Sequence, residues 1–381
     1  MGCLAVQALA EDARVEQVAI LDINLEQARQ VAEYLGSPKV SIRRVDLSDR
    51  QALVRALDGS VACLNATVYY TNLAVMEACL EAGVHYTDLG GLFHTTRKQL
   101  ALHPRFVAQD TSAVLGMGTA PGIPNIQARY AAERLDSVEY FRIYDGCRPV
   151  ASDTPLFTYA IPTIVDELTL EPVIFQGGEF VSRPPLSDFE DYWFTPPLGV
   201  LPMHLSLHSE VATLPVTYRD KGVQECFFKI NYWGMSRQVV EKIKVLVEFG
   251  FGGREAVTVG GTKLIPRDVM IAMMSGYVPS IRDYLSPSKF QPPDWTQEIV
   301  TEVRGKRAGK TITYRIGTLT SKRSEPTGLA GAISAIWLAE GRIPPGVHAP
   351  EAVMEPEAFF KELEQNEIPT QVSVTTDYSE A

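Results

Sequence analysis

Asp88, His208 and Glu210 are the side chains in this sequence best suited to transfer a proton at a binding site. General acid–base catalysis favours groups whose pKa lies near the working pH, and a histidine or carboxyl group in a cleft can meet that condition. We predict a catalytic role for all three. Asp88 could instead only form a turn before two glycines, and His208 could be a structural hydrogen-bonding residue. His94, which could simply begin a helix, is a further candidate.

Three more residues are predicted to contact a substrate: Asn125, Tyr144 and Arg148. Arginine binds a carboxylate with two parallel hydrogen bonds, so Arg148 suits a substrate that carries one. The alternative for Arg148 is a salt bridge at the surface. The sequence contains no P-loop, G-x-S-x-G or H-E-x-x-H motif, so the usual signatures of phosphoryl transfer, acyl transfer and zinc proteolysis are missing. No metal site is predicted.

The spacing between Gly2 and Asp22 indicates a dinucleotide site. Such sites need a glycine-rich turn that opens a helix, and an acidic residue about 20 positions later that binds the ribose hydroxyls. Gly2 opens a predicted helix and Asp22 ends a predicted strand at that distance. Gly2 therefore fits the third glycine of G-x-G-x-x-G, and the first strand and first two glycines would lie before residue 1. Alternatively, Gly2 belongs to an ordinary chain start and Asp22 is a solvated turn residue.

The remaining residues of the predicted cofactor site are Asp46, Asn65, Ala66, Thr67 and Asp88. Asn65, Ala66 and Thr67 end a predicted strand, where they would lie along the ribose and the nicotinamide. Asp46 could approach the adenine edge or cap the following helix. Asp22 favours NAD over NADP, because a carboxylate repels the 2′-phosphate. NADP stays possible.

Most of these residues follow the ends of short strands that alternate with helices. Three such strands, at 61–64, 85–87 and 112–115, end in small or polar residues. Alternation of this kind implies right-handed parallel crossovers, and ligands in such sheets bind beyond the carboxyl ends of the strands. Two further strands are expected before these three, at 15–22 and 40–45. Together the five strands predict an α/β fold with a doubly wound parallel sheet that lacks its first strand.

After residue 136 the pattern changes to that of a second, mixed α/β domain. An alternating run at 224–232 and a hairpin-like pair at 295–304 and 310–317 indicate an antiparallel sheet. Two helices are expected between them, at 236–249 and 266–275. A helix of small residues at 327–338 would then return the chain to the first domain.

The predicted domain boundaries follow from this return. The dinucleotide-binding domain comprises residues 1–123 and 326–365, and the substrate and dimerisation domain comprises residues 124–325. Residues 366–381 are polar and are predicted to form a mobile tail.

The composition excludes several classes of protein. The 381 residues carry a net charge of −11 without a run of lysine and arginine, which argues against a nucleic-acid partner. The five cysteines form no C-x-x-C pair, so we expect reduced thiols and a cytoplasmic protein, without a disulfide framework or zinc site. No apolar run approaches the roughly 18 residues of a membrane span, so no membrane partner is expected.

Three segments resemble the saccharopine dehydrogenase superfamily: LNATVYYTNLAVMEACLEAGVHYTDLGG, GMGTAPGIPN and EPTGLAGAISAIWLAEGRIPPGVHAPE. Within it, the pattern is most similar to the lysine 6-dehydrogenase-like and saccharopine reductase-like branch. The resemblance implies a Rossmann domain interrupted by a substrate and dimerisation domain, and therefore a homodimer. It also implies NAD(P)-linked oxidation or reduction of a carbon–nitrogen bond in an amine or imine derived from an amino acid.

In such a reaction, a base holds the proton of the nitrogen and an activated water hydrolyses the imine. Asp88, His208 and Glu210 are the candidates for these tasks, and the substrate would be small and similar to an amino acid. The alternative is a non-catalytic dimeric scaffold protein that has lost its cofactor site with the missing glycine motif.

Overall fold

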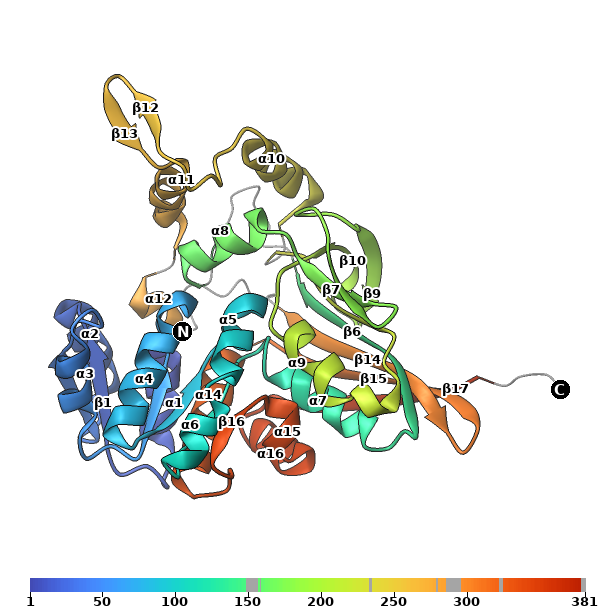
Figure 1. The fold of residues 1–381 in the computed structure, drawn as a ribbon, viewed down its shortest axis with the longest axis horizontal. Helices are drawn as coiled ribbons and strands as arrows, with labels where there is room; N and C mark the ends of the chain where they lie inside the picture. Colours follow the sequence, from blue (N-terminus) through green and yellow to red (C-terminus); the bar gives the residue numbers. More distant parts are fainter. Residues whose placement is uncertain are drawn as a thin grey trace.

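The computed structural model describes residues 1–148, 157, 159–232, 235–278, 280–285, 296–321 and 325–377. Figure 1 shows a part that contains the N-terminus, with short strands among many helices, and a part built on a larger sheet that extends towards the C-terminus. The predicted α/β class, with a Rossmann-like parallel sheet and a mixed second part, is confirmed.

The first part contains two parallel sheets. Its strands are β1 (Val18–Asp22), β2 (Val40–Arg44), β3 (Ala62–Asn65), β4 (His85–Asp88), β5 (Ser112–Val114) and β16 (Gly346–His348). Four of them form a sheet in the order β16-β5-β4-β3, and β1 pairs separately with β2. Among the described residues, β1 and β3 therefore each keep one edge without a strand partner. In the doubly wound order, one more strand would stand between these two edges.

Helices cover these sheets, and several begin at a side-chain cap. Asn24 caps α2 and Asp49 caps α3, each by accepting a hydrogen bond from a backbone N–H in the first turn. The cap of α3 was predicted at Asp46, but that carboxylate accepts from the N–H and hydroxyl of Ser48 instead, in the turn before the helix. The helices of this part are α1 (Gly2–Glu11), α2 (Leu25–Leu35), α3 (Arg50–Leu57), α4 (Asn72–Ala82), α5 (Leu92–Leu100), α6 (His103–Ala108), α7 (Ile123–Ala132), α14 (Glu325–Ala339), α15 (Pro350–Val353) and α16 (Pro356–Gln365).

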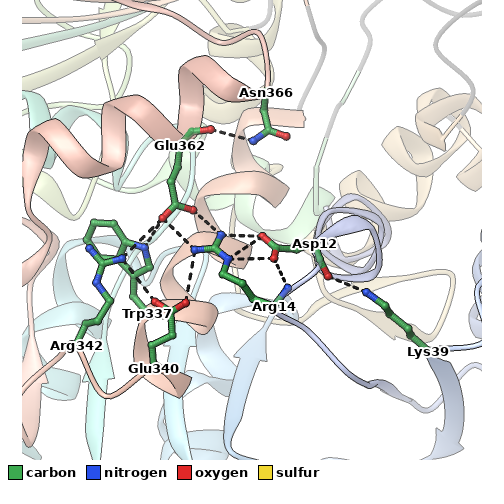
Figure 2. Close-up of polar contacts among 8 residues, drawn as sticks. All are labelled: Asp12, Arg14, Lys39, Trp337, Glu340, Arg342, Glu362 and Asn366. Carbon is green, nitrogen blue, oxygen red and sulfur yellow. Dashed lines mark hydrogen bonds and ion pairs between the residues drawn. The ribbon is translucent and has the colours of Figure 1, made fainter.

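Helix α14 returns the chain to the first part, where it packs against α1, β3 and β4. Gly328 allows the close approach to α1, because a Cβ at this position would lie 2.6 Å from the carbonyl carbon of Leu4. Figure 2 shows a polar network beside this contact: Arg14 and the indole N–H of Trp337 both donate to the carboxylate of Glu362, at 2.7 and 2.6 Å. These bonds tie the segment between α1 and β1 to α14 and α16. The exact domain boundaries stay predictions.

The second part is built on a sheet of nine strands in the described residues. They are β6 (Ser137–Cys147), β7 (Val173–Gln176), β8 (Glu179–Ser182), β9 (Glu190–Phe194), β10 (Gly199–Leu205), β11 (Glu225–Ile230), β14 (Gln297–Arg307), β15 (Lys310–Thr320) and β17 (Thr370–Thr376). The main path runs β17-β15-β14-β6-β11-β10-β9, and only β6 and β11 pair in parallel. Trp295, predicted to begin the hairpin strand, lies outside the described residues.

Strand β17 corrects the prediction of a mobile tail after residue 365. Residues Thr370–Thr376 pair antiparallel with β15 along the whole strand. Their sequence, TQVSVTT, is rich in threonine and valine, and these β-branched residues suit an exposed edge strand. The polar composition concealed this pattern. Asp377 is the last described residue of this segment.

The other helices of the second part lie on the sheet or project away from it, except α12, which packs against α1 and α2 of the first part (Figure 1). Helix α8 packs against α10 and α11, and the hairpin of β12 and β13 projects beyond them. No helix in the described part of the chain is long and apolar enough to cross a membrane. These elements are α8 (Ile161–Thr169), α9 (Glu210–Thr217), α10 (Arg237–Glu248), β12 (Val257–Val259), β13 (Thr262–Leu264), α11 (Pro266–Met274) and α12 (Ile281–Leu285).

Candidate active site

A cavity of about 390 Å³ lies between the two parts. The first part contributes residues at the carboxyl ends of its strands, such as Ala66 and Thr67 after β3 and Gly90 after β4. The second part contributes polar side chains from β6, α8 and the segment before α9. A volume of this size suits a small ligand or the reactive end of a larger one. Its position agrees with the rule that ligands bind beyond the carboxyl ends of parallel strands.

His208 lines the cavity and forms a pair with Glu210. Its Nδ1 lies 2.5 Å from Oε2 of Glu210, and both side chains are buried. The imidazole stacks on the ring of Phe228, with 3.8 Å between the ring centres. Burial alone would lower the pKa of His208, but the charge of Glu210 and its hydrogen bond raise that pKa above the ordinary value. The two predicted residues are thus brought together, with the carboxylate placed to orient the imidazole.

Asp145 lines the same cavity from the end of β6. Its carboxylate accepts a hydrogen bond of 2.8 Å from the side-chain amide of Gln297. Burial raises the pKa of Asp145 to about 6. Tyr144, the predicted substrate contact, does not line the cavity; it stacks on Tyr192 with 3.8 Å between ring centres. Consecutive strand residues point to opposite faces of a sheet, so the neighbour of the predicted residue takes the cavity position.

Glu167 reaches the cavity from α8. The hydroxyl of Tyr159, which also lines the cavity, donates to its carboxylate. Burial raises the pKa of Glu167 to about 7. Asp145 and Glu167 interact electrostatically with each other and with His208. The cavity therefore contains several groups whose protonation changes near neutral pH, which is typical of acid–base sites.

Asp88 was predicted to face the cleft, but its carboxylate is buried and does not line the cavity. It accepts hydrogen bonds from five donors, which are the backbone N–H groups of Gly90 and Gly116 and the side chains of Tyr86, Asn72 and Gln99. Through these hydrogen bonds the Asp88 carboxylate holds together the chain segments that follow β4 and β5. Roles for Asp88 in catalysis or cofactor binding stay untested predictions, and this geometry gives them no support.

Asn125 and Arg148, the other predicted substrate contacts, do not line the large cavity either. Asn125 is buried at the start of α7, where it accepts from the N–H of Gly122 and donates to Glu351 at 2.8 Å. Arg148 follows β6, and its backbone N–H donates to the carbonyl of Thr296. His94 is exposed on α5. The predicted substrate contacts of Asn125 and Arg148 and the predicted catalytic role of His94 therefore stay untested, and the position of these residues outside the cavity gives them no support.

The predicted cofactor residues take several places around the first part. Ala66 and Thr67 line the cavity, and Gly2 lies beside them, since a Cβ on Gly2 would be 3.3 Å from that of Ala66. Asn65 is buried and accepts from the N–H and hydroxyl of Thr67, which shapes the turn. Asp22 ends β1 and accepts from the N–H of Asn24.

These residues fit the pyrophosphate and nicotinamide of a dinucleotide. Helix α1 begins at Gly2 without a side-chain cap, so its first N–H groups remain available to an anion. Ala66 is small enough to let a flat ring approach the end of β3. Asp46, which is engaged with Ser48, gives no further indication of an adenine contact. In the described part of the chain, no group of three or more histidine, cysteine, aspartate or glutamate side chains is arranged to hold a metal ion.

Four further residues line the cavity that were not predicted from the sequence: Asp145, Glu167, Tyr159 and Gln297. For Asp145, the alternation along β6 was the available signal, because it distinguishes an inward acid from its outward neighbours. For Glu167, the signal was an acidic pair in the otherwise apolar helix IPTIVDELT. No local pattern identifies Gln297, which is placed by the pairing of β14 with β6.

Two family models match this chain. The model described as saccharopine dehydrogenase NADP binding domain matches residues 1–114, and the model described as saccharopine dehydrogenase C-terminal domain matches residues 118–368. Together they span both parts of the molecule and the cavity between them.

Solved structures are also similar to this chain, to different degrees. Apo saccharopine dehydrogenase (L-Glu forming) from Saccharomyces cerevisiae is similar with a TM-score of 0.70 and 16% identity, over 98% of each chain. A probable dehydrogenase from Thermotoga maritima has a TM-score of 0.42 and 10% identity, over 97% of this chain and 94% of its own. An amine dehydrogenase from Mycobacterium smegmatis has a TM-score of 0.42 and 10% identity, over 91% of this chain and 92% of its own. At 16% identity, the likeness to the Saccharomyces cerevisiae structure concerns the fold alone.

Proposed function

Because this chain belongs to the saccharopine dehydrogenase family, we propose that it is an NAD(P)-dependent oxidoreductase that acts on the carbon–nitrogen bond of a small amine or imine. The observation that carries this proposal is the place of the His208–Glu210 pair. His208 lines a cavity whose opposite wall is formed by the strand ends of the nucleotide-binding part, and Glu210 is paired with this imidazole. A proton-transfer group is thus close to where a nicotinamide ring would lie.

Bound NAD(P)⁺ would supply the hydride acceptor, held by the start of α1 at Gly2 and by Ala66 and Thr67. In the oxidation, the substrate carbon gives up a hydride and its nitrogen gives up a proton, which leaves a carbon–nitrogen double bond. Water then hydrolyses this double bond. The products are a carbonyl compound and either a free amine or ammonia.

His208 is the proposed acceptor of the nitrogen proton. Its Nδ1 is engaged by Glu210, so the opposite ring nitrogen is the one left for a ligand. The Glu210 carboxylate stabilises the imidazolium that forms, as a carboxylate does for histidine bases in other enzymes. Glu167 has a pKa of about 7, which suits a second proton-transfer step, such as the activation of water for imine hydrolysis.

Two measurements test the proposal. Titration of the protein with NADH and NADPH, followed by nucleotide fluorescence, reports cofactor binding and which nucleotide is preferred. Amine-dependent formation of NAD(P)H then reports the reaction. Absence of nucleotide binding would instead favour the non-catalytic scaffold, in which the nucleotide-binding part serves only as a structural domain.

A further inference from the structure

The charges in the cavity are unbalanced. Asp145 and Glu167 are both buried carboxyl groups on its wall, and none of its described lining residues is a lysine or an arginine. The partners that the structure gives them are neutral: the amide of Gln297 for Asp145 and the hydroxyl of Tyr159 for Glu167. The His208 ring is already paired with its own carboxylate, Glu210.

The adjacent residue on α8 shows how this protein neutralises a buried acid that has no ligand. Asp166 is completely buried, and it binds Arg267 through two hydrogen bonds of 2.9 Å and Arg254 through one of 2.7 Å. Among the described residues, no arginine pairs with Glu167, one position further. Burying a charge without a counter-charge is costly, and the described residues give Glu167 and Asp145 only neutral hydrogen-bond donors.

We propose that the substrate is an aliphatic amine with at least two amino groups, and that Asp145 and Glu167 bind the ammonium group that does not react. This inference rests on the proposed function and names the substrate class of that site. The reacting nitrogen must be neutral when hydride leaves the adjacent carbon. A monoamine would therefore leave both carboxylates unbalanced during the reaction, whereas a diamine keeps one positive charge between them.

The same charges disfavour an amino-acid substrate. The carboxylate of an amino acid needs a cationic or donor-rich partner, and the described lining residues provide two carboxylates instead. Arg148, the predicted partner of a substrate carboxylate, is not among them. A substrate carboxylate would also repel Asp145 and Glu167 in an environment where charges are weakly screened.

Three compounds of equal chain length separate these possibilities: 1,5-diaminopentane, 1-aminopentane and L-lysine, which is the diamine with an added carboxylate. Spermidine and 1,3-diaminopropane extend the series to other lengths. Binding to the full chain is measured by calorimetry at pH 8, with and without NAD⁺, so that the result does not depend on turnover. We expect at least one diamine or triamine to bind about 10- to 100-fold more tightly than 1-aminopentane and L-lysine.

Asp145→Asn and Glu167→Gln test the assignment of the two carboxylates. Each substitution keeps an oxygen for the hydrogen bond from Gln297 or Tyr159, and we expect each to weaken diamine binding about 10-fold or more. Glu179→Gln, at an exposed position on β8, is the matched control and should change nothing. Melting temperatures show whether each variant is folded.

The outcomes are distinct. The inference is overturned if L-lysine or 1-aminopentane binds as well as the diamines, if no amine of the series binds, or if the folded Asp145→Asn and Glu167→Gln variants bind diamine normally. Diamine binding without nucleotide binding or turnover would support the ammonium site while contradicting the proposed oxidoreductase function.

Discussion

Oε2 of Glu210 lies 2.5 Å from Nδ1 of His208, while its other oxygen has no hydrogen-bond partner in the described residues. The carboxylate thus orients one imidazole and stabilises its protonated form. This arrangement makes the two residues act as a unit, so that the effects of changing them are not additive.

If His208 accepts the proton of the substrate nitrogen, His208→Asn should lower kcat/KM by roughly 10²- to 10⁴-fold, the usual contribution of a general base. Glu210→Gln should lower it less and should shift the acidic limb of the pH profile to lower pH, because the charge that raises the pKa of His208 is gone. Steady-state kinetics from pH 6 to pH 10 provide the measurement.

His94→Asn is the control for that experiment, because His94 is exposed on α5 and does not line the cavity. Its kinetics should match those of the unchanged protein. Equal activity of His208→Asn and His94→Asn would remove His208 from the mechanism and leave Glu167 as the candidate base.

Asp88→Asn should destabilise the protein. The Asp88 carboxylate accepts hydrogen bonds from five donors, and an amide would direct its own N–H groups at some of them. Unsatisfied buried donors cost about 1–3 kcal/mol, so we expect a clear fall in melting temperature, with activity per folded molecule retained. Asp46→Asn, in an exposed turn, should have little effect on stability because asparagine suits such turns. An unchanged melting temperature together with lost activity would restore Asp88 as a functional residue.

Local pattern explains which parts of the fold could be predicted from sequence. The prediction succeeded for β3, β4 and β5 and for the helices between them. In this region the apolar runs, the helix caps and the turn residues all indicate the same element boundaries. The return of α14 to the first part was also expected, because small residues such as Gly328 permit close packing. The edge strand β17 was missed because its hydroxyl-bearing residues read as a polar tail.

The candidate site was harder to predict because tertiary pairing assembles it. Asp145 and Gln297 meet only because β14 pairs with β6, and Glu167 comes from a separate helix. Tyr144, which was predicted from the sequence, is one residue from Asp145 and lies on the face of the strand that does not line the cavity. His208 and Glu210 could be predicted because they stand close together in the sequence.

The burial of Glu167 predicts a pH dependence of stability. Its pKa rises to about 7 on folding, from an ordinary value of 4.5, because burial penalises the charged form. At Glu167 the folded protein therefore holds more protons than the unfolded chain between these values, and the contribution of this residue to stability falls as pH rises from about 4.5 to 7.

Glu167→Gln should remove that contribution. The stability of the variant relative to the unchanged protein should increase by about 1–3 kcal/mol between pH 4.5 and pH 7.5, measured by urea unfolding without ligand. The other groups that face Glu167, namely Tyr159, Asp145, Asp166 and His208, are the same in both proteins. If the difference in unfolding free energy between the two proteins does not vary with pH, the pKa of Glu167 is the same in the folded and the unfolded chain.

Arg267→Met and Arg254→Met should differ strongly in stability although both arginines bind Asp166. Arg267 is nearly buried and holds both carboxylate oxygens at 2.9 Å, whereas the Arg254 side chain is 58% exposed and binds one oxygen at 2.7 Å. Removing one partner of a buried ion pair costs about 3–5 kcal/mol, whereas an exposed pair contributes about 0–1 kcal/mol. We therefore expect urea unfolding to show a large loss for Arg267→Met and a small one for Arg254→Met. Equal losses would mean that the exposed Arg254 neutralises Asp166 as effectively as the buried Arg267 does.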